Sequence, residues 1–358
     1  MPDIPNLWKE PALAPPRALG GSLGQGRLRV EPEDFVVEED LGFEPSGEGA
    51  HVLLKVRKRN ANTEWVARAL ARAIGCRPGD VGFAGLKDRR AVAVQWFSVP
   101  KPRPRAQDSA PALAVLAEVR GEGFEVLEAH AHAKKLPRGA LAGNRFTLRV
   151  RETQLDDAKL DERIEAVRRD GLPNYFGPQR FGRDAANLSK IVTDPNAIHP
   201  RERTYVLSAA RSLVFNAVLA ARVSDGSWCG LEVGDVANLD SRGSVFAVDA
   251  VDDSLEERAA RLDIHPTGPL WGRGELLSRG RIQVLEQRVS ESFAGPCALV
   301  IAAGMRQERR SLRLAVRDLD WHRDGGDIGL RFWLTKGSFA TTVLRELFDT
   351  DPDSDPQE

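Results

Sequence analysis

The chain lacks most features of a secreted, membrane-spanning or zinc-binding protein. Only three of its 358 residues are cysteine, and Cys76, Cys229 and Cys297 lie far apart, without the spacing of a zinc site. It contains no apolar run of about 18 residues, the length that a membrane span needs. The first residues, MPDIPNLWKEPALAPP, place no apolar stretch behind a basic start, as a secretory signal would. We therefore expect a cytoplasmic protein without a membrane segment or a structural metal.

Lysine is also scarce, since only 10 of the 51 basic residues are lysine and the others are arginine. The planar guanidinium group suits bidentate phosphate contacts and stacking on bases. A GC-rich genome that favours arginine codons would produce the same bias. With a net charge of −1 and 42% apolar residues, the chain has the composition of an ordinary globular protein long enough for two domains. Composition alone leaves a nucleic-acid partner open.

Residue patterns predict a sheet-bearing domain built from both ends of the chain and interrupted by a helix-rich segment. Residues 1–25 are expected to form an extended arm, and the proline-rich residues 100–112 a surface loop. Strands are predicted within residues 26–37, 51–57, 92–99, 124–132 and 145–151, and as a pair around the DGGD turn within 314–339. Helices are predicted over residues 62–75, 160–171, 208–226 and 340–347.

The segment GFAGLKDRRAVAVQWFSV places a carboxylate among basic residues. Gly82 and Gly85 permit a tight turn that lifts a short polar segment away from its surroundings. Asp88 then stands beside Lys87 and two arginines, directly ahead of a predicted strand. An ionised carboxylate in such a place can act as a nucleophile or base at a sugar carbon. A loop aspartate in a surface ion pair would have the same sequence, so this segment alone does not decide its role.

Two other loops carry groups suited to holding a base. Asn144 follows Gly143 in a predicted turn, where its amide is free to hydrogen-bond a ligand. Phe339 lies between a predicted strand and a helix, where its ring could stack on a base. Each has a structural alternative, since asparagine is common in turns and Phe339 would also suit a buried position behind a capping Ser338.

Two segments of the helix-rich region leave binding and packing open. Residues 171–182, GLPNYFGPQRFG, crowd aromatic, amide and guanidinium groups around glycines, a mixture that suits either unpaired RNA bases or a packed turn. In the helix predicted over 208–226, Arg211, Asn216 and Arg222 would line a binding face or lie on a solvated helix face.

Taken together, these segments resemble the TruD family of tRNA pseudouridine synthases over about residues 26–348. The resemblance rests on six motifs in the family's order: PEDFVVEED, AGLKDRRAVAVQW, GNRFTLRVR, GLPNYFGPQRFG, ARSLVFN and KGSFATTVLREL. It implies an α+β fold, in which a pseudouridine-synthase catalytic domain of mixed, largely antiparallel sheet with helices carries an inserted helix-rich TRUD domain. The expected boundaries are 1–169 and 316–348 for the catalytic domain, 170–315 for the insertion and 349–358 for an acidic, disordered tail.

The resemblance also implies a reaction and roles for individual residues. The expected activity isomerises the uridine at position 13 of tRNA to pseudouridine, without a metal, an organic cofactor or an obligatory protein partner. Asp88 would be the nucleophile, and it would either attack C1′ of the ribose or remove a ribose proton. Contacts to the target uridine carry over to Phe35, Asn144 and Phe339, and supporting basic roles to Arg29 and Lys87.

Two departures and two alternatives accompany this prediction. Ala93 stands where the family often has threonine, so a hydrogen bond near the site is expected to be absent, and Arg29 stands where lysine is common. The main alternative is a catalytically silent RNA-binding or chaperone protein on the same scaffold. A glycoside hydrolase would need a second carboxylate acting with Asp88, and no acidic residue directly flanks Asp88 in the sequence.

Overall fold

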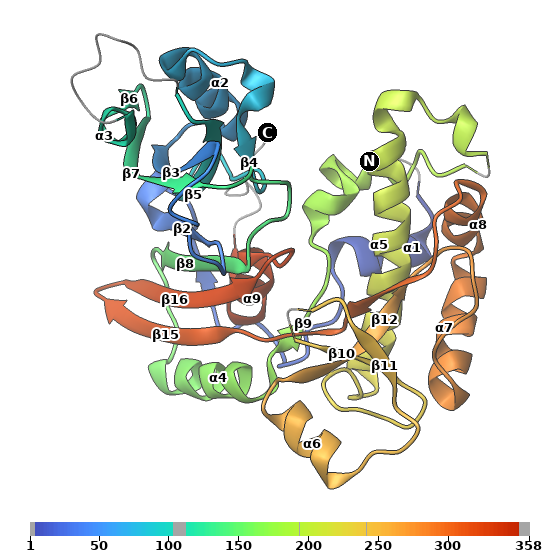
Figure 1. Ribbon diagram of the computed structural model, residues 1–358. Helices are drawn as coiled ribbons and strands as arrows, with labels where there is room; N and C mark the ends of the chain where they lie inside the picture. Colours follow the sequence, from blue (N-terminus) through green and yellow to red (C-terminus); the bar gives the residue numbers. More distant parts are fainter. Residues whose placement is uncertain (1–3, 103–111, 193, 241, 351–358) are drawn as a thin grey trace. The chain divides into compact units, whose positions relative to one another are not determined.

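The computed structural model describes residues 4–102, 112–192, 194–240 and 242–350 (Figure 1). Its contacts divide the chain into two units, each made of segments that are separated in sequence. We call the first the large-sheet unit, and it consists of Leu23–Asp157, Arg317–Gly337 and Phe348–Glu358. The second is called the α5 unit, and it consists of Met1–Ser22, Ala158–Val316 and Ser338–Leu347. The predicted insertion, residues 170–315, lies within the α5 unit, which also takes in two segments from nearer the chain ends.

The large-sheet unit contains a nine-stranded sheet in the order β15-β16-β8-β2-β5-β3-β7-β6, with β4 paired to β5. Strands β2 and β5 run parallel, and the other neighbours in this sheet run antiparallel. A separate short parallel pair joins β1 and β17. The strands are β1 (Gln25–Gly26), β2 (Phe35–Asp40), β3 (His51–Arg59), β4 (Gly82–Phe83), β5 (Val92–Pro100), β6 (Arg120–Gly121), β7 (Phe124–His132), β8 (Gly143–Val150), β15 (Arg317–Asp324), β16 (Asp327–Thr335) and β17 (Asp349–Thr350).

Helix α2 (Thr63–Ile74) packs on one face of this sheet (Figure 1). It begins where the Asn62 side chain accepts a hydrogen bond from the Glu64 backbone N–H, and it ends at Gly75 with a φ of 75°. The helix predicted over 62–75 is therefore confirmed, and so are its caps. The apolar contacts join Val66, Ala67, Leu70 and Ala71 of the helix to Val52, Leu54, Val56, Phe97 and Val99 of the sheet. The unit also contains α3 (Ala112–Ala117), η1 (Pro32–Asp34) and η2 (Pro78–Asp80).

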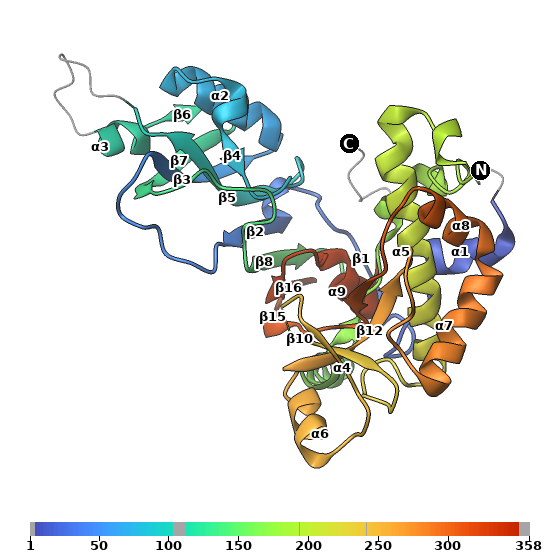
Figure 2. The ribbon, with the colours of Figure 1, turned by 45° about the vertical axis from the view of Figure 1, so that its right-hand side comes forward.

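The α5 unit is organised around its longest helix, α5 (Pro200–Ser224). Helices α1, α7 and α8 pack around α5, as Figures 1 and 2 both show. Helix α5 also contacts β12 of a four-stranded antiparallel sheet in the order β11-β10-β12-β13. The helices are α1 (Asn6–Leu13), α4 (Asp157–Asp170), α6 (Asp253–Ala260), α7 (Gly280–Ser292), α8 (Ala294–Ala302), α9 (Ala340–Leu347), η3 (Pro178–Phe181), η4 (Arg183–Ala185) and η5 (Pro195–Ala197). The strands are β9 (Leu172–Pro173), β10 (Val236–Leu239), β11 (Val245–Ala247), β12 (Ile264–Leu270), β13 (Glu308–Ser311) and β14 (Arg313–Leu314).

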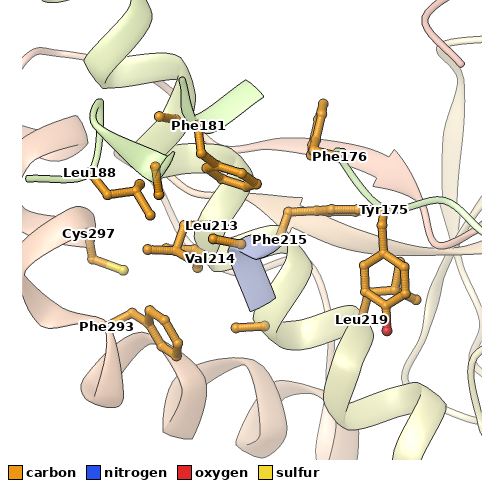
Figure 3. Packing of buried hydrophobic residues seen from close by; sticks show 14 of the residues in the cluster. Tyr175, Phe176, Phe181, Leu188, Leu213, Val214, Phe215, Leu219, Phe293 and Cys297 are labelled. Carbon is orange, nitrogen blue, oxygen red and sulfur yellow. The ribbon is translucent and has the colours of Figure 1, made fainter. Parts of the chain in front are cut away.

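The aromatic segment 171–182 packs into the core of this unit. Tyr175, Phe176 and Phe181 are buried beside α5 (Figure 3), and the rings of Phe176 and Phe215 meet edge to face at 5.5 Å between centroids. The side chain of Asn216 accepts a hydrogen bond from the Phe176 N–H at 2.9 Å and donates one to the Phe176 carbonyl at 2.9 Å. The packing interpretation of this segment is therefore confirmed for its three aromatic side chains.

Helix α5 is long and apolar enough to cross a membrane by length and composition alone. However, 67% of its most apolar window is buried inside the protein, as in the central helix of a folded domain. Asn216 and Arg222 are also buried, at 0% and 1% exposure, so the prediction of a solvated helix face was wrong for these two residues. The reason is that partners outside the helix satisfy both side chains, which a helical pattern cannot show.

Three further predictions need correction. Residues 1–25 are not wholly extended, because Asn6–Leu13 form α1. Its Pro11 and Ala12 are buried, and the Pro11 carbonyl accepts a hydrogen bond from Asn216 Nδ2 at 2.8 Å. The inserted region also contains the sheet of β10–β13, whose short strands lack the alternating pattern that predicts strands. Within the predicted loop at 100–112, residues 103–111 lie outside the described residues. The tail predicted to be disordered over 349–358 was placed too early, because Asp349 and Thr350 form β17 paired with β1, and its residues 351–358 lie outside the described residues.

Breaking one buried ion pair in the α5 unit is expected to destabilise it strongly. Arg222 donates to both carboxylate oxygens of Asp235, at 2.8 and 3.2 Å, and both side chains are at most 1% exposed. Arg222→Met should lower the free energy of unfolding by about 3–5 kcal/mol, because it leaves a buried carboxylate without its cation. Urea denaturation would measure this loss. The double variant Arg222→Met/Asp235→Leu, which removes both charges, should recover most of it, and equal losses in the two variants would contradict this explanation.

Candidate functional site

Asp88 lies on the loop that connects β4 to β5 in the large-sheet unit. Its side chain is 35% exposed, and its Oδ2 accepts a hydrogen bond from Arg29 Nη2 at 2.7 Å. The Arg29 side chain is only 4% exposed. A charge-assisted contact of this length with a buried guanidinium fixes the direction of the carboxylate while leaving part of it open to solvent. The loop therefore presents an oriented carboxylate at the protein surface.

Arg29 reaches this position from an unusual backbone conformation. Its φ is 54°, in the left-handed region, which costs a residue other than glycine about 1–2 kcal/mol. The guanidinium carbon lies 4.2 Å from the centroid of the Phe35 ring. That ring is itself 5% exposed and packs edge to face on Phe146, with 6.0 Å between centroids. Phe35 thus supports Arg29 from the interior, and the strained backbone is retained where Arg29 holds Asp88.

The sheet face beneath this loop carries polar residues among apolar ones. Along β2, Phe35, Val37 and Glu39 are buried and share one face, because side chains alternate along a strand. The cross-strand register places Asn144 of β8 opposite Glu39, so both side chains lie on that face. Two further polar residues lie on the same face. Ala93 of β5 is paired with Val37 and with Lys58 of β3, and Gln95 follows Ala93 by two residues, so Lys58 and Gln95 share this face.

Glu39 links this face to the residue before Asp88. Its Oε1 lies 2.5 Å from Lys87 Nζ, and its Oε2 accepts a hydrogen bond from the Trp96 N–H at 2.8 Å. Burial raises the pKa of the Glu39 carboxyl, and the neighbouring Lys87 ammonium opposes that shift. Lys87 is therefore held by a buried carboxylate, with its own side chain 11% exposed. Beside this pair, Asn144 Oδ1 is buried and has no hydrogen-bond partner among the residues that the structure describes.

The loop backbone is anchored from below by three side chains. Gln95 Nε2 donates to the Gly85 carbonyl at 2.6 Å, and Thr63 Oγ1 accepts from the Lys87 N–H at 3.1 Å. Lys58 Nζ donates to the carbonyls of Lys87 and Asp88, at 3.2 and 2.8 Å. The loop is therefore fixed at its start and at the carboxylate-bearing residue itself.

These contacts bring together five of the six predicted site residues within the large-sheet unit: Arg29, Phe35, Lys87, Asp88 and Asn144. Phe339 belongs to the α5 unit, directly before α9, and its side chain is 37% exposed. Its role at the site therefore stays a prediction. Ala93 is fully buried and lies opposite Lys58 in the register of β3 and β5.

Sequence reasoning missed Lys58, Glu39, Gln95 and Thr63. A signal existed for two of them. The alternation of Val52, Leu54 and Val56 continues to Lys58, and that of Phe35 and Val37 continues to Glu39, so both charges stand at buried positions of predicted strands. A charge at such a position requires a partner. Across the described ranges, no group of three or more histidine, cysteine, aspartate or glutamate side chains is placed to hold a metal ion.

Relatives of the chain match most of its length. The sequence model of the family described as tRNA pseudouridine synthase D (TruD) matches residues 21–193 and 196–347. A tRNA pseudouridine synthase D of Pseudomonas syringae pv. syringae is 42% identical over 346 residues, which cover 94% of this chain and 95% of the relative. The protein of the same name from Methylococcus capsulatus is 43% identical over 351 residues, which cover 95% and 96%.

A crystal structure from Methanosarcina mazei, assigned to tRNA pseudouridine synthase D (TruD), has a similar fold. It matches with a TM-score of 0.74 at 20% identity, covering 98% of this chain and 100% of that chain. This likeness confirms the predicted α+β fold class, in which a largely antiparallel mixed sheet is combined with helices. The family match and the relatives both extend over most of the sequence. The chain therefore belongs to the TruD family of tRNA pseudouridine synthases.

Proposed function

We propose that this protein isomerises a uridine of tRNA to pseudouridine and that Asp88 is the catalytic carboxylate. The bond between uracil N1 and ribose C1′ breaks, and C5 of the same base then bonds to C1′. No atom is gained or lost, so the reaction needs no redox partner. The expected target is the uridine at position 13, which the family membership supports.

The oriented carboxylate of Asp88 carries this proposal. Arg29 fixes its direction at 2.7 Å, and the side chain is still 35% exposed, so a ribose can approach it. A carboxylate in this state can attack C1′ or remove a ribose proton, and both routes require the same positioning. A base inside folded RNA must leave its stack to reach such a group, so the target uridine is expected to be flipped out.

The detached uracil must be held while it turns, and Asn144 suits this task. Its buried amide oxygen lacks a hydrogen-bond partner among the described residues, and uracil offers an N3–H donor between two carbonyl acceptors. An asparagine amide can pair with both kinds of group. The exposed Phe339 ring is proposed to stack on the base, and Phe35 to support the site through Arg29.

The two units are proposed to have separate roles. The large-sheet unit carries the catalytic loop, and the α5 unit, which contains most of the predicted TRUD insertion, is proposed to bind tRNA with it. Binding should weaken as salt rises, because arginine and lysine contacts to phosphates release counterions. We propose that the protein acts in the cytoplasm without an obligatory protein partner, which is consistent with its family.

Incubation with unmodified tRNA tests the proposal. Wild-type protein should convert a single uridine, which chemical mapping of pseudouridine would locate, and the expected position is 13. A tRNA with cytidine at that position should bind but give no product, and it serves as the matched control. Binding of unmodified tRNA without any isomerised base would instead support a silent RNA-binding protein and would overturn the proposed activity.

A further inference from the structure

Lys58 is a charged residue in the interior of the large-sheet unit. It is fully buried near the end of β3, on the face where Val52, Leu54 and Val56 pack against α2. Removing an ammonium group from water is costly unless hydrogen bonds replace its hydration. A lysine at this position therefore needs a specific set of acceptors.

Those acceptors are three backbone carbonyls. Lys58 Nζ donates to Ala61 at 2.8 Å, to Lys87 at 3.2 Å and to Asp88 at 2.8 Å. An ammonium has three N–H donors, so these contacts use its full capacity. The first carbonyl belongs to the turn before α2, and the other two belong to the loop that carries the proposed catalytic carboxylate. Lys58 thus ties that loop to the rigid end of a central strand.

Two cations consequently hold Asp88 from different directions. Arg29 binds its carboxylate at 2.7 Å, and Lys58 binds its carbonyl at 2.8 Å. The backbone contact sets where the residue lies, and the side-chain contact sets where the carboxylate points. A displacement of about 1 Å in a reacting group can cost about 10²-fold in rate.

We propose that Lys58 is a positioning residue for the isomerisation, whose ammonium holds the backbone of Lys87 and Asp88 so that the Asp88 carboxylate meets the ribose in a reactive orientation. This inference rests on the proposed function. Lys58 acts through Asp88 and does not itself touch the substrate, since its side chain is fully buried and its three donors are directed at the backbone.

The charge on Lys58 gives the proposal a pH signature. Burial lowers the pKa of Lys58 to about 8; the Asp88 and Glu39 carboxylates oppose this shift, and the Lys87 ammonium adds to it. The residues that the register places opposite it, Ala93 of β5 and Phe124 of β7, are uncharged. Above its pKa the neutral amine has two N–H donors for three carbonyls, so one of the three hydrogen bonds is lost. The rate should then fall by about tenfold between about pH 7 and about pH 9.

Stability should respond to Lys58 in the opposite direction. Between about pH 8 and the ordinary lysine pKa, the unfolded chain keeps a proton on this residue that the folded chain has lost. The unfolded state therefore binds more protons, and the contribution of Lys58 to the free energy of unfolding rises with pH. A purely structural role would not make activity fall while this contribution rises.

Lys58→Met tests the proposal, because it keeps the apolar stem and removes the ammonium. Under single turnover with excess enzyme, the rate of pseudouridine formation should fall by about 10²-fold, and the tRNA dissociation constant should change less than about threefold. Lys58→Met should also lose the fall in rate above about pH 8. Lys55→Met is the matched control, because Lys55 lies three residues earlier on the opposite face of β3, paired with Glu38 and Glu128, and should keep its rate.

Two results would overturn the inference. One is a Lys58→Met rate within about threefold of wild type. The other is a wild-type rate that stays constant from about pH 7 to about pH 9.5, a measurement that does not depend on whether the variant folds. Failure of the proposed function is distinguishable from both, because in that case the wild-type protein forms no pseudouridine at all.

Discussion

Asp88→Asn is expected to reduce pseudouridine formation by about 10³-fold or more. The amide matches the carboxylate in shape, so the loop contacts below it should remain. It is, however, neither a nucleophile nor a base, and Arg29 Nη2 loses the anionic oxygen that lies 2.7 Å away. Single-turnover rates on unmodified tRNA would measure the loss. Affinity for tRNA should change by less than about threefold, because contacts to phosphates dominate it.

Asp80→Asn provides the matched control for this variant. Asp80 lies eight residues earlier, at the end of η2, where its carboxylate accepts a hydrogen bond from the N–H of Arg77, and it has no proposed part in the reaction. Its variant should keep the wild-type rate. Full activity in Asp88→Asn would exclude Asp88 as the catalytic group, whereas parallel loss of activity and tRNA binding would assign it to binding.

Arg29→Met should lower the single-turnover rate by about 10²-fold. Removing the guanidinium frees the Asp88 carboxylate to rotate, and it also uncovers the Phe35 ring, over which Arg29 lies at 4.2 Å. The substitution keeps a long apolar stem in a position where the Arg29 side chain is 4% exposed. The expected signature is therefore a reduced rate with tRNA affinity and thermal stability close to those of wild type.

Arg29→Lys is the informative companion to this variant. Lysine keeps the positive charge near Asp88 but lacks the planar group that stacks on Phe35. Because the ammonium can still donate a charge-assisted hydrogen bond to the Asp88 carboxylate, we expect it to restore the rate to within about tenfold of wild type. Equally reduced rates in Arg29→Met and Arg29→Lys would show that charge alone does not orient the carboxylate, whereas wild-type rates in both variants would remove Arg29 from the site.

The local elements of the fold were largely predictable from sequence. The apolar periodicity and caps of residues 62–75 specify α2, and the alternation in 51–57 and 145–151 specifies β3 and β8. These signals are local because each residue's propensity and its neighbours three or four positions away decide the outcome. By contrast, α1 has a proline inside it, and β10 and β11 are too short to show a period. Tertiary contacts determine those elements, because α1 packs against α5, β10 pairs with β12 and β11 pairs with β10.

The candidate site shows the same division between local and distant causes. The motif around Asp88 and its order among the other motifs indicate the family and the proposed nucleophile. The partners of the loop were harder to find, because Arg29 and Lys58, which contact Asp88, and Glu39, which contacts Lys87, precede the loop by tens of residues and approach it only in the folded chain. Each of these charges is buried, and a buried charge is stable only where acceptors or counter-charges converge on it.

The sequence by itself determined the family and the fold class and indicated Asp88 as the proposed catalytic carboxylate, because these inferences depend on motifs and periodicities that can be read along the chain. The tertiary structure alone decided how that carboxylate is held. Two strands bring Lys58 and Glu39 under the loop, and a left-handed residue turns Arg29 onto Asp88. Cross-strand register brings together residues that are far apart in sequence, and the cost of burying a charge requires that these residues be paired. Neither cause leaves much trace in the sequence near Asp88.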